Sequence, residues 1–294
     1  MQAETLTTAG QTSVFQTARL SEVGGRPNNE DFCASLQVDE ATCWVVADGL
    51  GAHNGGELAS RTAAETLLES FRANPEISRS ALETHISAAQ EAILKLQRQD
   101  PAVAEMRTTL VALISDSRQA QWAHVGDSRL YRFQARGLVA QTEDHSVPQS
   151  LAKAGEIPAD QIRGHPDRNR LLRSLGEHGP ARASVLAAPT PLCETDAFLL
   201  CTDGFWEHVL EIEMLADLVA SASPQEWLDR AASRLRERVH GEYDNYSALA
   251  IFYAPRATDR PASVPANPKV QRRKRRSRWL RRASRRSLVR REAT

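Results

Sequence analysis

The sequence lacks any apolar run of about 18 residues, the length that an α-helix needs to cross a bilayer. It therefore predicts no membrane-spanning segment. The first 16 residues, MQAETLTTAGQTSVFQ, contain no basic stretch followed by an apolar one, so we expect no secretory signal. No internal repeat is visible.

Cysteine is also rare, with four residues in 294, and none of them has C-x-x-C spacing. Cys43 and Cys201 lie inside apolar runs, while the other two are Cys33 and Cys193. This pattern favours buried, reduced thiols in a cytoplasmic protein over disulfides or a zinc site. None of the four lies in a loop that could cradle a phosphate, so we expect no cysteine nucleophile.

The formal net charge is zero, but the charge is divided unevenly along the chain. Residues 255–294 contain 15 Lys and Arg and two Asp and Glu, which gives +13. That leaves 22 of the 37 basic and 35 of the 37 acidic residues for residues 1–254, which gives −13. We therefore divide the chain into an acidic body, 1–254, and a Pro- and Arg-rich basic tail, 255–294, that has too few apolar residues to build a core and is expected to be disordered.

The body alternates between apolar runs typical of strands and amphipathic segments typical of helices. The expected strands are residues 43–48, 108–115, 119–126, 130–133, 198–203 and 247–254. The expected helices are 57–72, 79–98 and one that begins after Ser223, with Pro224 at its first position and Glu226 as the reciprocal cap. Because the strands of 108–133 follow one another after short turns, they predict antiparallel pairing and an α+β fold.

Four aspartates lie at the edges of these strands, each beside Gly or Asn. Asp48 and Asp203 end apolar runs, Asp127 follows another, and Asp244 precedes one. A single acid at such a position is ordinary turn chemistry, but four suggest that the carboxylates converge. Their repulsion would have to be neutralised, and Arg129 is the only basic residue beside them in the sequence.

A divalent cation neutralises such a group better than one arginine does. Carboxylate, carbonyl and water ligands suit Mg²⁺ or Mn²⁺ rather than zinc, and the Gly49 carbonyl could approach as a further ligand because glycine has no Cβ. Two such ions about 3.5–4 Å apart would make a hydroxide nucleophile from a bridging water, which favours a phosphoester substrate. In RPNNED, Arg26 could hold the phosphate oxygens, while Glu30 and Asp31 could hold metal-bound waters.

The ordered motifs of the body match a family. They are RPNNED, VVADGLGAHNGGELAS, RTTLVALI, AHVGDSRLYRF, EDHS, HPDRNRLLRSLG, LLCTDGFWEHV and DNYSALAIF. Over roughly residues 14–254 the sequence resembles the metal-dependent type 2C (PPM-type) serine/threonine protein phosphatases, most strongly their bacterial branch. The resemblance implies an α-β-β-α four-layer sandwich of two antiparallel sheets flanked by helices.

The resemblance also implies a role for each matching position. Asp48 would bridge two Mn²⁺ or Mg²⁺ ions, the Gly49 carbonyl would bind one of them, and Asp203 and Asp244 would hold the other. Asp127 would bind a third, weaker ion. Arg26 would bind the substrate phosphate, with Glu30 and Asp31 in or behind the water shell, and residues about 145–168 would form a flap over the cleft.

The implied reaction is hydrolysis of phosphoserine and phosphothreonine in proteins by direct attack of a metal-bridging hydroxide, without a phospho-enzyme. The implied partners are a cognate bacterial Ser/Thr kinase and its substrates. Two positions depart from the family pattern, with Ala52 and Arg107 standing where glycine is usual. His53 is either the general acid for the leaving alkoxide or a residue that packs nearby.

The tail has three alternative interpretations: a solvated segment, a contact with an anionic membrane surface, or a contact with an acidic partner or nucleic acid. Trp279, Leu280 and Leu288 between the arginines suit a membrane surface. We expect no specific nucleic acid, and a cytoplasmic protein that lies at the inner face of the membrane through this tail. The rival to an enzyme is a binding module that keeps the fold without turnover, but Asp48, Asp203 and Asp244 are all present.

Overall fold

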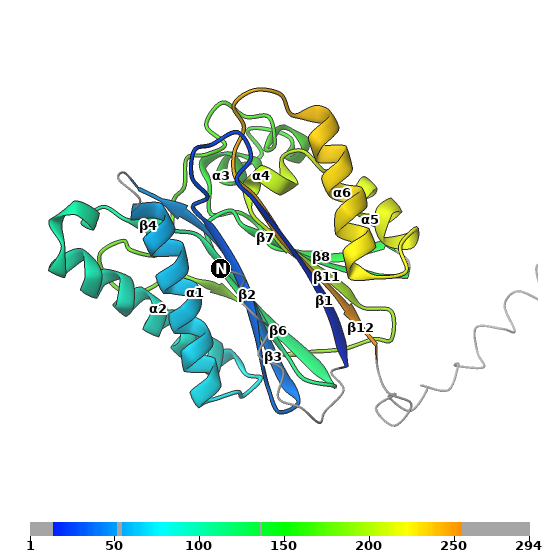
Figure 1. Ribbon diagram of the computed structural model, residues 1–294, viewed down its shortest axis with the longest axis horizontal. Helices are drawn as coiled ribbons and strands as arrows, with labels where there is room; N and C mark the ends of the chain where they lie inside the picture. Colours follow the sequence, from blue (N-terminus) through cyan, green and yellow to red (C-terminus); the bar gives the residue numbers. More distant parts are fainter. Residues whose placement is uncertain (1–13, 52–54, 136, 255–294) are drawn as a thin grey trace, which may run out of the picture. The chain divides into compact units, whose positions relative to one another are not determined.

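The computed structural model describes residues 14–51, 55–135 and 137–254. In this part of the chain two antiparallel sheets lie face to face, and helices cover their outer faces (Figure 1). One sheet has the strand order β1 (Phe15–Glu22), β12 (Tyr246–Tyr253), β11 (Ala197–Cys201), β7 (Arg129–Gln134) and β8 (Gly137–Gln141). The other has the order β10 (Thr190–Pro191), β6 (Gln119–Val125), β5 (Leu110–Ser115), β3 (Ala41–Leu50) and β2 (Asp31–Val38), with β4 (Arg107–Thr108) beside β3 and β9 (Ser184–Val185) beside β6.

Two groups of helices cover these sheets. The long helices α1 (Gly55–Ala73) and α2 (Arg79–Gln99) pack on the sheet that contains β3. The helices α4 (Asp203–Trp206), α5 (Glu211–Val219) and α6 (Pro224–Arg238) pack on the sheet that contains β11. Helix α3 (Val147–Ala154) and two single turns, η1 (Pro101–Val103) and η2 (Ala159–Gln161), complete the list. The predicted α-β-β-α sandwich is confirmed.

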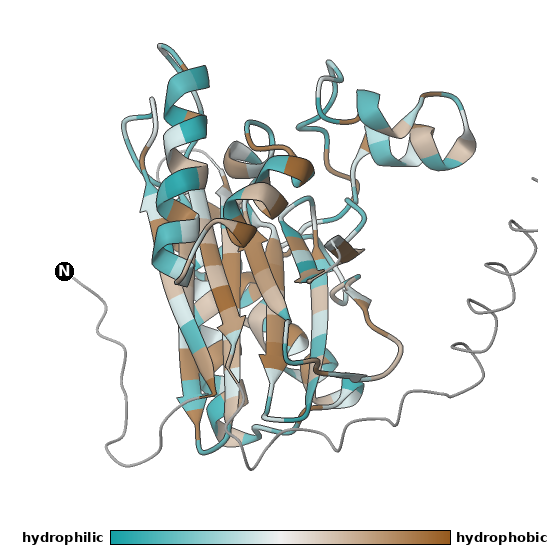
Figure 2. Ribbon diagram, turned by 90° about the vertical axis from the view of Figure 1, so that its right-hand side faces the viewer, coloured by the Kyte–Doolittle hydropathy of each residue, from teal (hydrophilic) through white to brown (hydrophobic). Residues whose placement is uncertain are grey.

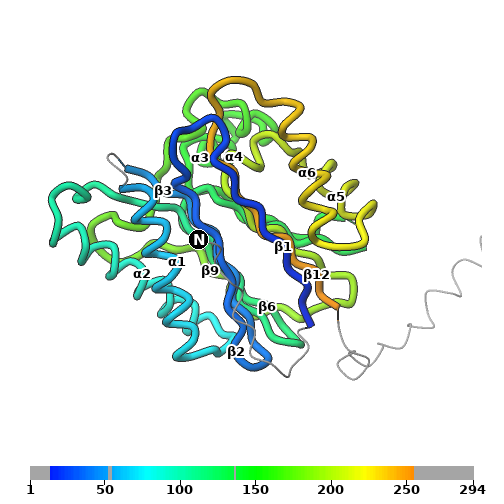
Figure 3. The backbone as a smooth tube through the Cα atoms, viewed as in Figure 1, coloured from blue at the N-terminus to red at the C-terminus, as the bar shows by residue number. Residues whose placement is uncertain are grey.

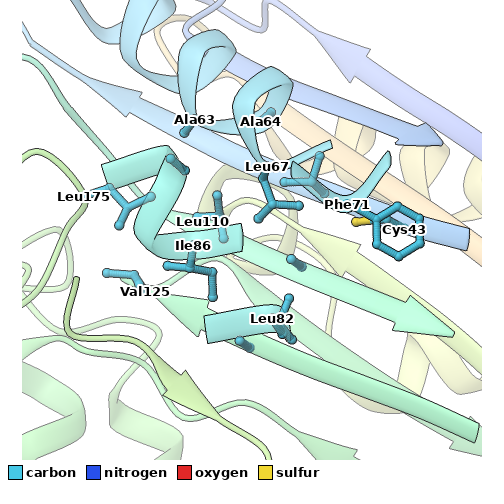
Figure 4. Close-up of a cluster of buried hydrophobic side chains, with 14 of the residues drawn as sticks. Cys43, Ala63, Ala64, Leu67, Phe71, Leu82, Ile86, Leu110, Val125 and Leu175 are labelled. Carbon is cyan, nitrogen blue, oxygen red and sulfur yellow. The ribbon is translucent and has the colours of Figure 1, made fainter. Parts of the chain in front are cut away.

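Three apolar clusters hold the four layers together. Figure 2 shows many residues of the strands in brown, the hydrophobic end of its scale. Along β3, Cys43 and Val45 face α1 and α2, whereas Trp44 and Val46 face the other sheet. Successive side chains of a strand point to opposite faces, and both faces of this strand are covered. The run CWVVA is therefore continuously apolar instead of alternating. Figure 4 shows the cluster beneath the helices, in which Leu67 and Phe71 of α1 lie close to Cys43.

The two ends of the described chain are joined in one sheet. Phe15 at the start of β1 is the register partner of Tyr253 at the end of β12, and the pairing continues to Glu22 and Tyr246. Figure 3 shows the two strands, blue and orange, side by side. The expected tail, 255–294, lies outside the described residues, so the division of the chain at residue 254 stays a prediction.

The structure corrects several expected elements. Strands β1 and β2 were not predicted, because their exposed sides carry polar residues and no continuous apolar run marks them. The run 198–203 leaves its strand after Cys201, and Asp203 opens helix α4. Helix α6 begins as expected, since Ser223 Oγ accepts from the Glu226 N–H at 3.2 Å. However, the Glu226 carboxylate accepts from Ala222, one residue before the cap.

All four cysteines are free thiols. Three of them are buried, as expected, while Cys193 is exposed. Burial raises the pKa of Cys33 to about 12, so this thiol stays protonated at neutral pH. Among the described residues no helix combines the length and the apolar character that a membrane span requires.

Candidate metal centre

The four aspartates that flank strands in the sequence lie at one end of the two sheets. Asp48 lies near the end of β3, and Asp127 lies in the turn between β6 and β7. Asp203 is the first residue of α4, directly after β11, and Asp244 lies just before β12. Strands β3 and β6 belong to one sheet, whereas β11 and β12 belong to the other. The packing of the two sheets therefore brings these acids together.

Three of the four carboxylates meet. Asp48, Asp127 and Asp203 each offer one oxygen, and these oxygens lie within 4.8 Å of one another. Asp127 and Asp203 are buried, and Asp48 is partly exposed. Across residues 14–51, 55–135 and 137–254, no other group of three His, Cys, Asp or Glu side chains converges in this way.

A cavity of about 350 Å³ opens at this cluster. Seven of the eight residues predicted for the site line it: Arg26, Glu30, Asp48, Gly49, Asp127, Asp203 and Asp244. The eighth, Asp31, does not. Its carboxylate is buried and accepts a hydrogen bond from Thr202 Oγ1 at 2.9 Å.

Arg26 and Asp244 form an ion pair at the rim of the cavity. The Arg26 guanidinium donates to Asp244 Oδ2 at 3.0 Å, and their side chains are 54% and 40% exposed. The sequence singled out Arg129 as the cation beside the acids. In the structure the buried Arg129 guanidinium instead donates two hydrogen bonds, of 2.8 and 2.7 Å, to Asp144.

The main chain of Asp48 is held by two threonines of the neighbouring strands. The Asp48 N–H donates to Thr109 Oγ1 at 3.0 Å. The Asp48 carbonyl accepts from the Thr109 N–H and from Thr108 Oγ1, both at 2.8 Å. These bonds fix the backbone from which the carboxylate projects. Because Thr109 also lines the cavity, it is a site residue that the sequence analysis missed.

Two glycines allow backbones to approach closely beside the carboxylates. A Cβ on Gly49 would lie 2.0 Å from the Gly56 carbonyl oxygen, at the start of α1. A Cβ on Gly204 would lie 2.0 Å from the Asn245 carbonyl oxygen. Each Asp-Gly pair therefore places its acid where the chain packs backbone against backbone, which only glycine permits.

Asn245 holds the segment between β1 and β2 at the rim through three hydrogen bonds. Its side-chain amide donates to the Val23 and Asn28 carbonyls at 2.7 and 2.9 Å, and its Oδ1 accepts from the Glu30 N–H at 2.8 Å. The sequence analysis did not assign it a role, although it follows Asp244 directly at the edge of a strand. Six other lining residues were also missed: Pro27, Asn28, Leu50, Gly51, Asn169 and Leu171.

The carboxylates destabilise each other's charged forms. Burial, followed by the charge of Asp203, raises the pKa of both Asp48 and Asp127 well above the ordinary value. Burial and the charges of Glu207 and Asp244 raise the pKa of Asp203 to about 7. Burial raises the pKa of Asp31 to about 8, although its bond from Thr202 acts in the opposite direction. A cluster of this kind binds either protons or cations.

The donor set fits Mg²⁺ or Mn²⁺. The cavity offers carboxylate and main-chain carbonyl oxygens, and the described residues that line it include no cysteine or histidine. Hard divalent cations prefer such all-oxygen sites, whereas zinc prefers nitrogen and sulfur ligands.

The remaining predicted positions fall partly inside the described chain. His53 and Ala52 lie outside the described residues, so the question of a general acid at His53 stays open. Arg107 is the register partner of Leu50, and Leu50 lines the cavity. Residues 145–168, the expected flap, contain α3 and η2, and the chain that follows them reaches the cavity at Asn169.

Comparison with known proteins places this geometry in a family. A family model described as protein phosphatase 2C matches residues 22–242. The chain is 32% identical over 232 residues to the serine/threonine phosphatase stp of Listeria welshimeri, covering 77% of this chain and 90% of that protein. PppA of Pseudomonas aeruginosa, described as a key regulatory component of T6SS, has a solved structure that is 30% identical with a TM-score of 0.67, covering 82% of this chain and 98% of that one.

The catalytic domain of the phosphatase PstP, solved in complex with two manganese ions, shares the fold with a TM-score of 0.68 at 24% identity, covering 81% of this chain and 97% of that one. The family model alone spans well over half of the sequence. The chain therefore belongs to the protein phosphatase 2C family, the metal-dependent serine/threonine protein phosphatases.

Proposed function

We propose that this chain removes phosphate from phosphoserine and phosphothreonine residues of proteins at the cavity lined by Asp48, Asp127 and Asp203. The observation that carries the proposal is the convergence of these three carboxylates within 4.8 Å, in a cavity that Arg26 also lines. A site that is strongly acidic but has one arginine at its rim suits divalent cations together with a phosphoryl group.

In this proposal each acidic residue has one role toward the ions. Asp48 would contribute to holding both core ions, the Gly49 carbonyl to holding one of them, and Asp203 and Asp244 to holding the other. Asp127 would help to hold a third, weaker ion. When bound, Mn²⁺ or Mg²⁺ supplies Lewis-acid activation of water near neutral pH. Glu30 at the cavity wall orients water there. Asp31, which lies behind Glu30, supports the start of β2.

Arg26 binds the substrate. Its guanidinium is held at the rim by Asp244, and a cation that takes over Asp244 leaves the guanidinium free to donate two parallel hydrogen bonds to phosphoryl oxygens. The N–H groups of the Arg26 guanidinium then lie where negative charge builds up during in-line displacement at phosphorus.

Water, rather than a side chain, attacks the phosphorus. Among the described residues that line the cavity, the only hydroxyl side chain is that of Thr109. Its Oγ1 is already bonded to the Asp48 N–H and to Ser128 Oγ, so it is not placed as a nucleophile. This supports direct hydrolysis without a phospho-enzyme.

A matched pair of aspartate variants tests the proposal. We expect Asp203→Asn to abolish Mn²⁺-dependent hydrolysis of a phosphothreonine peptide, with a loss in kcat of at least about 10², while folding is retained. Asp217→Asn is the control, because Asp217 is equally buried but pairs with Arg234 on the outer helices. The proposal fails if Asp203→Asn keeps wild-type rates in saturating Mn²⁺, or if Asp217→Asn loses activity to the same extent.

A bacterial Ser/Thr kinase and its substrates are the partners that we propose for this activity. The support is the similarity to bacterial proteins that are named serine/threonine phosphatases. Comparing the phosphoproteome of cells that carry the wild type with that of cells that carry Asp203→Asn identifies the substrates. Phosphosites on one kinase and on its targets should rise together, and unchanged phosphosites would contradict this role.

We further propose that residues 1–254 are the catalytic domain of a cytoplasmic enzyme and that residues 255–294 hold it at the anionic inner face of the membrane. The support is compositional, since the two parts carry −13 and +13, and basic segments with interleaved apolar residues bind anionic lipid. The full chain should sediment with phosphatidylglycerol vesicles but not with phosphatidylcholine vesicles, and residues 1–254 alone should stay active and unbound. If the full chain and residues 1–254 sediment equally, the tail does not hold the enzyme at the membrane. A contact of the tail with an acidic partner would then be favoured.

A further inference from the structure

The peptide segment Gly126–Asp127 is held by contacts with side chains to which the proposed reaction assigns no role. Gly126 has a φ of +96°, and a Cβ at this position would lie 2.7 Å from Thr109 Cγ2. The turn is therefore pressed against the start of β5. Thr109 in turn bonds to the main chain of Asp48. Thr109 thus lies between the backbones that carry Asp48 and Asp127 and contacts both.

His145 holds this turn through two hydrogen bonds. The His145 N–H donates to the Gly126 carbonyl at 2.8 Å, and the Gly126 N–H donates to His145 Nδ1 at 3.1 Å. On the other side of the ring, Nε2 lies 2.8 Å from Ser184 Oγ and 3.3 Å from the Arg173 guanidinium. The ring also stacks on His124, with the centroids 4.5 Å apart and the planes at 9°. Its orientation is fixed from three sides.

Trp206 holds the other side of the turn. Its indole Nε1–H donates to the Asp127 carbonyl at 2.9 Å, and the side chain is only 1% exposed. The Arg129 guanidinium lies 3.5 Å from the centre of this indole ring and is bound through two hydrogen bonds to Asp144. Trp206 is also the last residue of α4, the helix that Asp203 opens.

These contacts form a continuous frame around Asp127. Asp144 and His145 are adjacent in the chain, so the ion pair with Arg129 and the bonds to Gly126 come from one segment. Trp206 connects the same frame to the helix turn that carries Asp203. Burial and the charges of Asp203 and Asp144 raise the pKa of the Asp127 carboxyl, while the charge of Arg129 and a hydrogen bond from the Asp127 backbone act in the opposite direction.

We propose that His145 and Trp206 are positioning residues that fix the Asp127 carboxylate against Asp48 and Asp203 and thereby set the affinity of the weakest metal site. The inference rests on the proposed function, because it assumes that Asp127 helps to hold a cation. Neither side chain lines the carboxylate cavity, so both act through the backbone of Gly126 and Asp127. Removing such outer-shell partners typically weakens metal affinity by roughly 10- to 100-fold.

Two substitutions remove the bonds with little change in volume. Trp206→Phe keeps an aromatic ring but loses the donor to Asp127. His145→Leu loses the acceptor for Gly126, whereas His145→Asn places an amide oxygen near the position of Nδ1 and should restore most of the effect. Trp227→Phe is the matched control, because the buried Trp227 indole lies in the same apolar cluster as Trp206 but donates to the Met214 carbonyl, at 2.8 Å, instead of to Asp127.

The experiment measures Mn²⁺ binding to the full chain by titration calorimetry, with the melting temperature as the check on folding. In Trp206→Phe and His145→Leu we expect the weakest Mn²⁺ binding event to weaken roughly 10- to 100-fold, as it does in Asp127→Asn, while the tighter events stay unchanged. Trp227→Phe should lower the melting temperature but leave the isotherm unchanged.

The inference is overturned if Trp206→Phe and His145→Leu bind Mn²⁺ as the wild type does, or if Trp227→Phe shifts the isotherm equally. It is also overturned if His145→Asn behaves like His145→Leu, or if the wild type shows no weak binding event. The proposed function fails separately, since its failure would appear as a wild type that neither binds Mn²⁺ nor hydrolyses the phosphopeptide.

Discussion

At the scale of single residues, the site is an arrangement of like charges with one compensating cation. Asp48, Asp127 and Asp203 share a cavity in which the charge of Asp203 raises the pKa of the other two. Asp244 forms an ion pair with Arg26 at the rim. That pair is exposed, so it contributes little to stability. Its value lies in holding a guanidinium beside the place where phosphate would bind.

We expect Arg26→Ala to lower kcat/KM for a phosphothreonine peptide by a factor on the order of 10², because a donor aimed at the phosphoryl oxygens is lost. Arg26→Lys should recover only part of this loss, since an ammonium group cannot form the two parallel bonds. Steady-state kinetics in saturating Mn²⁺ make the measurement. Arg79→Ala is the control, because Arg79 forms a similarly exposed ion pair with Glu83 on α2. Equal rates for the wild type and Arg26→Ala would rule out the assigned role.

At the scale of elements, the ends of the strands define the position of the site. Strand β3 is buried on both faces until Asp48, and Gly49 then meets the first turn of α1. The same arrangement recurs at Asp203 and Gly204, where α4 begins against Asn245. In both places an acid projects into the cavity because the glycine after it lets the backbone turn tightly against its neighbour.

We expect Gly49→Ala to destabilise the fold by about 3 kcal/mol or more, because the new methyl group would collide with the backbone of Gly56, which cannot move aside as a side chain could. Urea unfolding in the absence of metal measures the free energy of unfolding and keeps the effect separate from metal binding. Gly164→Ala is the matched control, since a Cβ there meets nothing within 4 Å. A Gly49→Ala protein as stable as the control would contradict the packing argument.

At the scale of the whole domain, the buried acids of the metal centre lower the free energy of unfolding when no metal is bound. In the folded protein the pKa values of Asp31 and Asp203 are raised to about 8 and about 7, against about 3.9 in an unfolded chain. The folded state therefore holds more protons than the unfolded state in this range. Its free energy of unfolding falls as the pH rises, by about 1.4 kcal/mol per pH unit for each proton so held.

We expect the melting temperature in EDTA to fall between about pH 7 and about pH 8.5, and we expect Mn²⁺ to remove most of this fall because the deprotonated carboxylates bind the cation. The buried histidines, whose pKa values are lowered, act in the opposite direction only below about pH 6.5, which is why the comparison starts at pH 7. Asp203→Asn should flatten the slope in EDTA. A melting temperature in EDTA that rises across this range would show that folding does not raise the pKa values of these acids.

The sequence by itself determined the class of fold and most of the site. Apolar runs that end in Asp-Gly marked the positions of Asp48 and Asp203, because a buried strand and a tight turn are local features that composition reveals. The same reasoning reached Gly49, Asp127 and Asp244. It missed β1 and β2, whose half-exposed sides dilute the apolar signal.

Only the tertiary structure decided how these residues are partnered. Arg26 pairs with Asp244 across 218 positions of the chain, Asn245 joins Val23, Asn28 and Glu30, and Trp206 reaches the carbonyl of Asp127. Asp31, adjacent to Glu30 in sequence, does not line the cavity, and its buried carboxylate instead accepts a hydrogen bond from Thr202 Oγ1. Such contacts depend on how the two sheets and their helices pack, and no local pattern records that packing.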